Sequence, residues 1–265
     1  MPSRVLVAIL ALVLSALSAS GQENADELAK QLSNPISSLI SVPFQFNYDY
    51  GGGPNDDGDN FYTRLQPVVP IELTDDWSVI VRTIMPFSYV DDIFPEPVLG
   101  MGDTTQSFFF SPKDSGIEGF TWGAGPAFLY PTATEIELGT GKWGIGPTAV
   151  VLQQIDKWSI GMLANHIVSF AGEEDRPDVN QTFLQPFAAY ALGDGQTLSA
   201  NLEATYDWEA EQWSVPTNIT YSKVFQAGTQ HMSWMIGGRY YFVTPENGPE
   251  WGIRSGLTFL FPNSE

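Results

Sequence analysis

The sequence predicts an all-β protein, a closed antiparallel transmembrane β-barrel of about twelve strands with short periplasmic turns and longer external loops. Three observations predict it: long segments with alternating faces, connections of alternating length, and tryptophans at the segment ends. The clearest segment is TLSANLEATYDW, residues 197–208, in which apolar and polar side chains alternate without a break. A period of two indicates a β-strand with unlike faces, one of which meets water.

Extended segments of this kind follow one another from Leu39 to the end of the chain. Each is about twelve residues long, whereas strands of soluble domains average about 5–6 residues and a tilted membrane strand needs about 9–11. The length therefore favours strands that cross a membrane. The predicted segments are Leu39–Tyr50, Phe61–Glu72, Trp77–Tyr89, Met101–Pro112, Glu118–Leu129, Lys142–Leu152, Lys157–Phe170, Val179–Leu192, Thr197–Trp208, Trp213–Phe225, His231–Val243 and Glu250–Pro262.

The connections between these segments are alternately short and long. Short joins such as LTDD, QQID, GDGQ and QAGTQ have turn-forming residues, and most of the intervening joins, such as GGGPNDDGDN and YPTATEIELGTG, are longer. Barrels of the bacterial outer membrane have short periplasmic turns and longer external loops. With the N-terminus in the periplasm, an even number of strands returns the C-terminus to the same side.

Tryptophans gather at the ends of the predicted strands, where the aromatic girdles of a membrane barrel lie. This placement indicates that the apolar face meets lipid and that the polar face lines the lumen. His166 and Lys223 would then face lipid, so we expect the alternation to break near them. The tryptophans at or next to segment ends are Trp77, Trp143, Trp158, Trp208, Trp213 and Trp251.

The N-terminal region has the features of an export signal. Arg4 precedes a short apolar run, and the small residues Ser18, Ala19 and Ser20 offer a cleavage site, so residues 1–20 are predicted to be a signal peptide. Residues 21–38 form a lead-in with a short helix in NADELAKQL, and residues 39–265 form the barrel. The helix is expected either to lie loosely in the periplasm or to sit in the mouth of the barrel.

The composition narrows the possible functions. Lys and Arg number 11 against 31 Asp and Glu, for a formal net charge of −20, which disfavours nucleic acid as a partner. The chain has no cysteine, two histidines and no G-x-S-x-G motif, so we expect no metal site, no cofactor and no enzymatic activity. The acidic loop at residues 55–60 lacks the spacing of an EF-hand calcium loop.

Charged residues on the polar face form the predicted lumen site. Arg64, Arg239 and Arg254 lie on the polar face, and Arg82 is less clearly placed. Barrel closure would bring their strands into one wall, opposite a wall that carries acidic and amide groups. The two walls would sort permeants by charge. Alternatively, the arginines pair with Asp49, Asp103 or Glu72 in a filled interior. The predicted site comprises Arg64, Arg82, Arg239, Arg254, Asp49, Asn201, Glu203 and Asp207, none of them catalytic or metal-binding.

Several stretches resemble one known family. LSNPISSLISVPFQFNYD, DTTQSFFFSPK, NLEATYDW and RYYFVTPENGPEWGIRSGLTFLFP are similar to segments of outer-membrane proteins grouped with the phenol meta-pathway degradation family. Chains of this family are often labelled simply as transporters, and sometimes as "neuromedin U". The resemblance covers nearly the whole mature chain. It implies an outer-membrane β-barrel connected with the uptake of small compounds, including aromatic or apolar ones.

We therefore expect a passive outer-membrane channel or transporter, whose partners are outer-membrane lipid and a small-molecule permeant. One alternative is a barrel with a filled lumen that serves as a structural or surface-interaction protein. Another is a soluble exported β-protein that binds a ligand in its core. Twelve strands lie between the eight whose interior side chains can fill and the sixteen that leave a channel, so strand number does not separate the first two.

Overall fold

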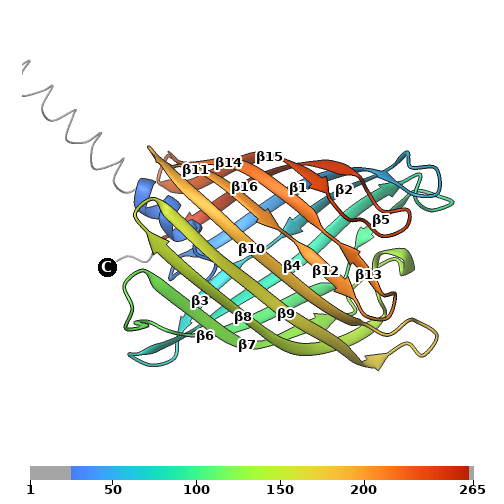
Figure 1. Cartoon of the computed structure of the whole chain (residues 1–265), viewed down its shortest axis with the longest axis horizontal. Coiled ribbons are helices and arrows are strands. Elements are labelled where there is room, and N and C mark those ends of the chain that lie inside the picture. Colours follow the sequence, from blue (N-terminus) through green and yellow to red (C-terminus); the bar gives the residue numbers. More distant parts are fainter. Residues whose placement is uncertain (1–24, 263–265) are drawn as a thin grey trace, which may run out of the picture.

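The computed structural model describes residues 25–262, which form one antiparallel sheet closed into a barrel (Figure 1). The signal peptide expected at residues 1–20 lies outside the described residues. None of the helices within residues 25–262 has the length and apolar character needed to cross a membrane.

The barrel wall in this part of the chain has twelve strand positions. Eight are continuous strands, and four are each made of two strands separated by a short break. The continuous strands are β1 (Ile40–Gly52), β4 (Trp77–Asp91), β7 (Phe120–Tyr130), β8 (Lys142–Ile155), β9 (Trp158–Gly172), β10 (Asn180–Gly193), β15 (Gln230–Tyr241) and β16 (Trp251–Phe261). The interrupted positions are β2 (Gly58–Leu65) with β3 (Val68–Glu72), β5 (Val98–Met101) with β6 (Thr104–Pro112), β11 (Gln196–Leu202) with β12 (Ala204–Asp207), and β13 (Gln212–Ser214) with β14 (Pro216–Ala227).

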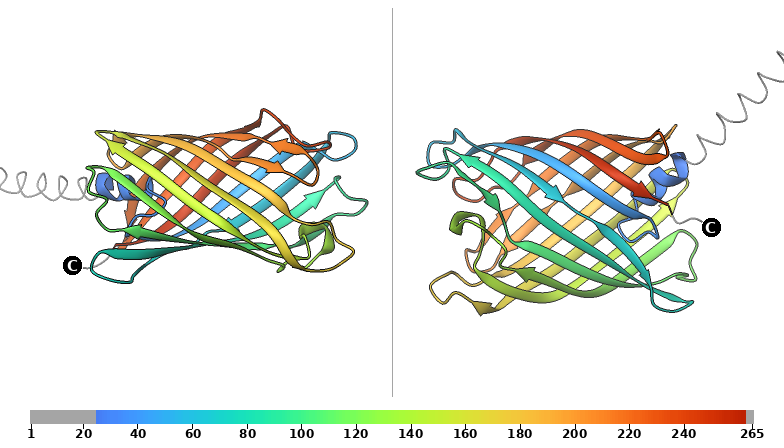
Figure 2. Two further views of the ribbon diagram at one scale, coloured as in Figure 1. Left: turned by 60° about the horizontal axis from the view of Figure 1, so that its bottom comes forward. Right: turned by 180° about the vertical axis from the view of Figure 1, so that it is seen from behind.

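The ring of hydrogen-bonded strands runs β1-β2-β4-β6-β7-β8-β9-β10-β11-β14-β15-β16 and returns to β1. The first and last strands pair in antiparallel register from Ile40 opposite Phe261 to Tyr50 opposite Trp251. The closed tube is visible from two further sides in Figure 2. The predicted fold, a closed antiparallel barrel of about twelve strands, is confirmed.

Two of the four breaks in the wall involve proline, which has no N–H to give to a strand ladder. Pro67 lies between β2 and β3, and Pro216 begins β14. Glu203 lies at the break between β11 and β12, where its backbone N–H donates to the carbonyl oxygen of Pro216 over 2.9 Å. The irregular backbone of β11–β12 and β13–β14 thus lies beside the central acid of the lumen.

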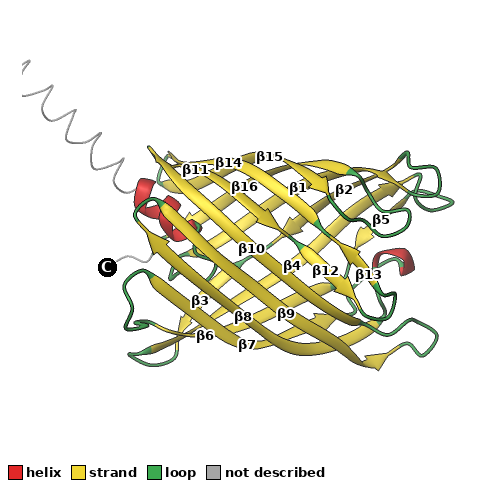
Figure 3. Ribbon diagram, in the orientation of Figure 1, coloured by secondary structure: helices red, strands yellow, loops and turns green. Residues whose placement is uncertain are grey.

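The two ends of the barrel differ, as Figure 3 shows. Five connections and both ends of the described part of the chain, residues 25 and 262, lie at one end, here named the turn end, and the other six connections form the loop end. The β10–β11 turn contains Asp194 and Gly195, both with positive φ, the conformation of a tight type I′ hairpin turn. At the loop end, the β7–β8 loop carries the short helix η1 (Ile136–Leu138).

The outer surface of the barrel is apolar and carries aromatic side chains near both ends. All six tryptophans predicted at strand ends are exposed, and Trp208 and Trp213 flank Tyr206 with ring centroids 4.8 and 4.9 Å apart. A soluble protein does not expose a continuous apolar belt of this kind. The wall therefore matches a membrane-spanning barrel.

The alternation does not break at His166 or Lys223, so that expectation was wrong. His166 contacts Thr182 on the outer face at 2.9 Å, and the same hydroxyl accepts the indole N–H of exposed Trp208. A hydrogen bond on the outside satisfies a polar group that would otherwise be unpaired in lipid. Lys223 pairs across β14–β15 with the exposed Trp234, near the turn end, where a long side chain reaches the interface.

The lead-in enters the turn end of the barrel, the second of its two expected placements. Residues 25–32 form a helix whose Leu28 and Ala29 pack on inward-facing Val224 and Leu260. The side chain of Asp26 accepts the backbone N–H of Gly195 in the β10–β11 turn over 2.6 Å. An isolated two-turn helix is unstable in water, so these contacts stabilise it.

Candidate functional site in the barrel lumen

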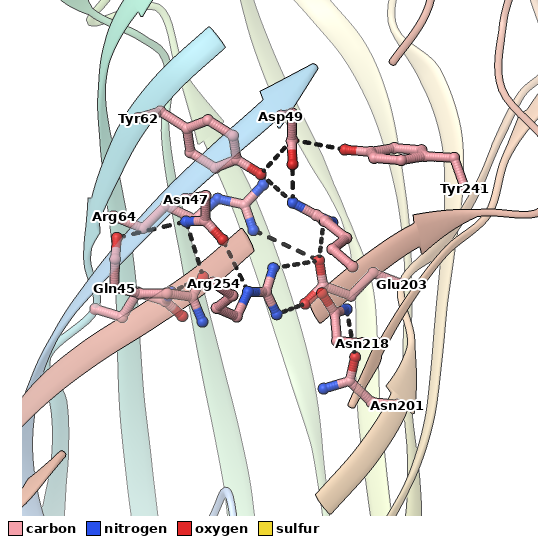
Figure 4. A network of polar contacts seen from close by, with 12 residues as sticks. Gln45, Asn47, Asp49, Tyr62, Arg64, Asn201, Glu203, Asn218, Tyr241 and Arg254 are labelled. Carbon is pink, nitrogen blue, oxygen red and sulfur yellow. Dashed lines mark hydrogen bonds and ion pairs between the residues drawn. The ribbon is translucent and has the colours of Figure 1, made fainter. Parts of the chain in front are cut away.

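Glu203 is the centre of a charged network across the middle of the lumen (Figure 4). The guanidinium of Arg254 donates from Nη1 to Oε1 over 2.6 Å and from Nη2 to Oε2 over 3.1 Å. Arg239 donates from Nη2 to Oε2 over 2.6 Å. Fork-shaped arginine–carboxylate pairs of this kind are among the strongest hydrogen bonds in proteins. Glu203 therefore joins the β11–β12 position to β15 and β16.

A second carboxylate, Asp49 on β1, completes the pairing of Arg239. Its Oδ2 atom lies 3.3 Å from Nη1 of Arg239 and accepts the hydroxyl groups of Tyr62 and Tyr241 over 3.0 and 2.7 Å. Arg239 also donates to the Tyr62 hydroxyl. Gly252 pairs with Asp49 across β1–β16, and a Cβ there would meet Oδ1 of Asp49 at 2.2 Å, so this position requires glycine.

The buried arginines leave few donors unused. Arg254 and Arg239 have side chains only 2% and 3% exposed, and Nε of Arg254 donates to Asn47 over 2.8 Å. Burial of a charge is costly unless the charge is paired and hydrogen-bonded. The two acids and two arginines balance each other in charge.

Arg64 and Arg82 are paired more weakly. Arg64, whose side chain is 31% exposed, approaches Glu203 only to 3.7 Å, and its guanidinium lies 5.0 Å from the ring centroid of Tyr62. Arg82 donates to the neutral side chain of Gln66 over 3.0 Å, and Gln66 donates in turn to Gln45. Gln45 is the direct neighbour of Arg64 across β1–β2. Hydrogen bonds thus join Arg82, Gln66 and Gln45, and Arg64 lies beside Gln45 on the next strand.

A cavity of about 530 Å³ opens beside this network. Among the described residues that line it, four are arginines and two are acids, Asp103 and Glu203. Asp103 accepts three hydrogen bonds from the β7–β8 loop, given by the backbone of Ala133 and by the backbone and hydroxyl of Thr140. The remaining charge of the lining is positive, although the whole chain has a formal net charge of −20.

The opposite side of the cavity carries apolar side chains between the uncharged amides of Asn165, Gln181 and Gln185. Leu163 and Ile167 of β9, with Phe183 of β10, line it there. β9 and β10 lie six places round the ring from β1 and β2, which is the opposite side of a twelve-strand barrel. Leu129, Ile167 and the loop residue Val179 form one buried cluster with Ala127. The cavity therefore has one charged wall and one uncharged wall with apolar side chains.

The β7–β8 and β9–β10 loops are fastened to each other at the loop end of the cavity. Arg176 donates to the carbonyl oxygens of Ile136 and Gly139 in the β7–β8 loop. Lys142 forms an ion pair with Asp178 over 3.1 Å, and the Lys142 ammonium holds the pKa of that exposed carboxyl below its usual value. A hydrogen bond from Ser169 to Asp178 acts in the same direction.

The structure brings most of the predicted site residues together. Arg64, Arg239, Arg254, Asp49 and Glu203 are in one network, and Arg82 lines the same cavity. Asn201 lines it too and accepts a hydrogen bond from Asn218. Asp207 is elsewhere, because it bonds to Gln181 and to the β12–β13 turn. The arginines and acids touch, so they do not form two charged stripes separated by an open pore.

Sequence reasoning missed the uncharged members of the network. Tyr62, Tyr241, Gln45, Gln66 and Asn47 all lie on inward positions of predicted strands. The same alternation that selected Arg64 selects Tyr62, Gln66 and, on β1, Gln45 and Asn47. Because these side chains carry no charge, they were not included in the predicted site. The filled interior predicted above would pair the arginines with Asp49, Asp103 or Glu72. The Arg239–Asp49 pair forms, whereas Glu72 pairs with Lys113 and Asp103 binds the β7–β8 loop.

Comparisons with known structures agree with this architecture. The chain is similar to the COG4313 outer membrane channel from Pseudomonas putida F1, with a TM-score of 0.64 and 15% identity over 84% of this chain and 96% of that one. It is also similar to the NanC porin, with a TM-score of 0.52 and 13% identity over 83% and 98% of the two chains. The fold is therefore that of bacterial outer-membrane β-barrel channels. No protein-family model matches, and no curated protein matches the sequence.

Proposed function

We propose that the protein is a passive channel of the bacterial outer membrane that admits small solutes, including aromatic or apolar ones. The observation that carries this proposal is a pair of adjoining cavities in the lumen. The central cavity of about 530 Å³ and a second one of about 250 Å³ share lining residues, and the second reaches the lead-in at Leu32–Asn34. The shared residues are Gln66, Arg82, Leu163, Gln185 and Asn201.

The outer wall and the N-terminal sequence support the proposed location. An apolar belt with tryptophans near both ends suits a bilayer. The signal-peptide pattern of residues 1–20 supports export. The apolar wall formed by Leu163, Ile167 and Phe183 supports solutes with an aromatic or apolar part, in keeping with the resemblance to the meta-pathway family.

A specific observation favours the filled barrel as a second candidate. The helix of residues 25–32 occupies the turn end, and Ile36 packs into a buried cluster with Ile80, Phe109 and Leu163. If these contacts persist in the membrane, they would close the lumen, and the protein would then serve a structural or surface-interaction role.

Conductance separates the two candidates. The mature protein, shown to be folded by its unheated gel mobility, would be inserted in planar bilayers and in liposomes for solute-swelling assays. Steady conductance and solute entry are expected. A barrel that inserts but neither conducts nor admits solutes would contradict the channel and favour the filled barrel.

A matched pair of variants tests the route through the lumen. Leu163 lines both cavities, whereas its neighbour Met162 lies exposed on the outer face. Leu163→Trp should lower the conductance several-fold because a larger side chain narrows the junction of the cavities. Met162→Trp should leave the conductance unchanged. Equal conductance of both variants would show that ions pass elsewhere.

A further inference from the structure

We propose, building on the channel function above, that the central cavity binds small carboxylates with an apolar body, with Arg64 and Arg82 as the groups that contact the carboxylate. This assigns a substrate class to the cavity. It rests on the charge balance of the network, on the position of the two arginines and on the apolar wall opposite them.

The charge balance leaves two guanidinium groups without an acid of their own. Glu203 receives three hydrogen bonds from Arg254 and Arg239, and Asp49 lies on the other side of Arg239. These two acids and two arginines neutralise each other. Arg64 is 3.7 Å from a carboxylate oxygen that Arg254 and Arg239 already occupy, and Arg82 bonds to a neutral amide.

Arg64 and Arg82 also have the accessibility that a binding site needs. Both line the central cavity, together with Gln45 and with Gln66, whose side-chain oxygen accepts the hydrogen bond of Arg82. The third acid near the cavity, Asp103, accepts three hydrogen bonds from the β7–β8 loop. An anion in the cavity would therefore meet two available guanidinium groups in surroundings of reduced dielectric constant, where charge-assisted hydrogen bonds are strongest.

The rest of the cavity is suited to an apolar group. Leu163, Ile167 and Phe183 face the arginine wall from the opposite side of the barrel. A volume of about 530 Å³ falls within the range of pockets for small organic ligands, about 300–1,000 Å³. An inorganic anion would leave the apolar side chains uncovered, and a neutral apolar solute would leave two guanidinium groups without an anion of their own. A carboxylate attached to an aromatic or alkyl body satisfies both walls.

Benzoate is the probe for this inference, with benzamide as a neutral molecule of the same shape and acetate as a carboxylate without the apolar body. Calorimetric titration of the folded protein in detergent at low salt measures their affinities. Benzoate is expected to bind about 10-fold or more tightly than benzamide, the factor that one charge-assisted contact supplies, and more tightly than acetate because its ring buries apolar surface. Equal affinities for benzoate and benzamide would overturn the inference.

Variants identify the groups responsible. Arg64→Gln/Arg82→Gln should lower benzoate affinity about 10-fold or more and leave benzamide affinity unchanged. The control Lys113→Gln/Lys223→Gln removes two positive charges outside the cavity, since Lys113 pairs with Glu72 at the turn end and Lys223 faces outward. If the control lowers the affinity as much as the arginine variant, the net charge and not the site would be responsible. If the double arginine variant fails to fold, Arg64→Gln alone serves the same test, because the Arg64 side chain is partly exposed.

Conductance and solute uptake test the proposed channel separately from benzoate binding. A barrel that conducts potassium chloride but binds benzoate no better than benzamide refutes the carboxylate site and leaves the channel intact. A barrel that binds benzoate selectively but neither conducts nor takes up solutes refutes the channel and keeps the site.

Discussion

The middle of the lumen and its turn end are filled by different kinds of contact. In the middle, Glu203 and Asp49 are held by directional hydrogen bonds from Arg239, Arg254 and two tyrosines, and a cavity remains beside them. At the turn end, Leu28 and Ile36 pack on apolar side chains. Ionic groups must keep fixed geometry to stay satisfied, whereas apolar side chains close on any surface that fits. The comparison shows that directional bonds hold the middle of the lumen, beside the larger cavity, whereas apolar packing holds the lead-in at the turn end, beside the smaller one.

The largest expected effect comes from removing the central acid. Glu203→Gln leaves Arg254 and Arg239 buried without a full countercharge, and breaking a buried ion pair in this way costs about 3–5 kcal/mol. Unfolding by urea in lipid or detergent, followed by gel mobility, measures the free energy. Asp207→Asn is the control, because Asp207 bonds to Gln181 and a turn and is outside the network. Similar stability of both variants would mean that the network does not stabilise the barrel.

The next effect tests the apolar end. Leu28 is 3% exposed, and Leu28→Ala removes a buried side chain that contributes about 2–5 kcal/mol in protein cores. Since the helix can leave the mouth without unfolding the wall, we expect a larger conductance and faster tryptic cleavage after Lys30. Gln31→Ala, a change at a residue whose side chain bonds only within the helix to Glu27, is the control. Unchanged conductance and cleavage would show that this packing does not hold the helix.

A third prediction contrasts two arginines of one network. Arg64→Gln should shift ion selectivity towards cations with a stability loss below about 1 kcal/mol, because its ion pair is long and partly exposed. Arg254→Gln should destabilise the barrel by several times more, since its partners are buried. Reversal potentials under a salt gradient measure selectivity, and urea unfolding measures stability. The same change in selectivity and stability for both variants would contradict the contrast.

The combined variant Arg64→Gln/Arg239→Gln/Arg254→Gln should make the lumen still more selective for cations. It removes three of the four arginines that line the cavity and keeps Glu203. A conducting triple variant with unchanged reversal potential would place the arginines outside the path of the ions.

The smallest effect concerns the loop end. Lys142 lowers the pKa of Asp178 below its usual value, so the contact stabilises the loops above the ordinary carboxyl pKa and is lost as the pH falls through the lowered one. In a Lys142→Gln variant the carboxyl should titrate at higher pH than in the wild type, as followed by nuclear magnetic resonance. Identical titration midpoints would show that the ion pair does not form in solution.

The strands could be predicted because each residue pattern reports a local requirement. Alternation over residues 197–208 reflects two unlike faces, and the outward Trp208 and inward Glu203 follow from it. The contacts of Glu203 could not be predicted, because they depend on the strand stagger and on the break before Ala204. His166 shows the same limit, since a hydrogen bond with Thr182 on the next strand lets a polar residue face outward. The side chains that meet across two strands depend on the register of those strands, and the closed ring of strands sets that register.

The pairing of β1 with β16 also has a consequence for how the barrel is assembled. Arg254 on β16 bonds to Asn47 on β1, 207 positions earlier in the chain, and Arg239 on β15 bonds to Asp49 on β1. Contacts between residues so distant in sequence carry a large loop-closure cost, which slows folding. The buried arginines of the central network therefore also join the two ends of the chain. A change at Arg239 or Arg254 should therefore affect the closure of the barrel as well as the stability of its lumen.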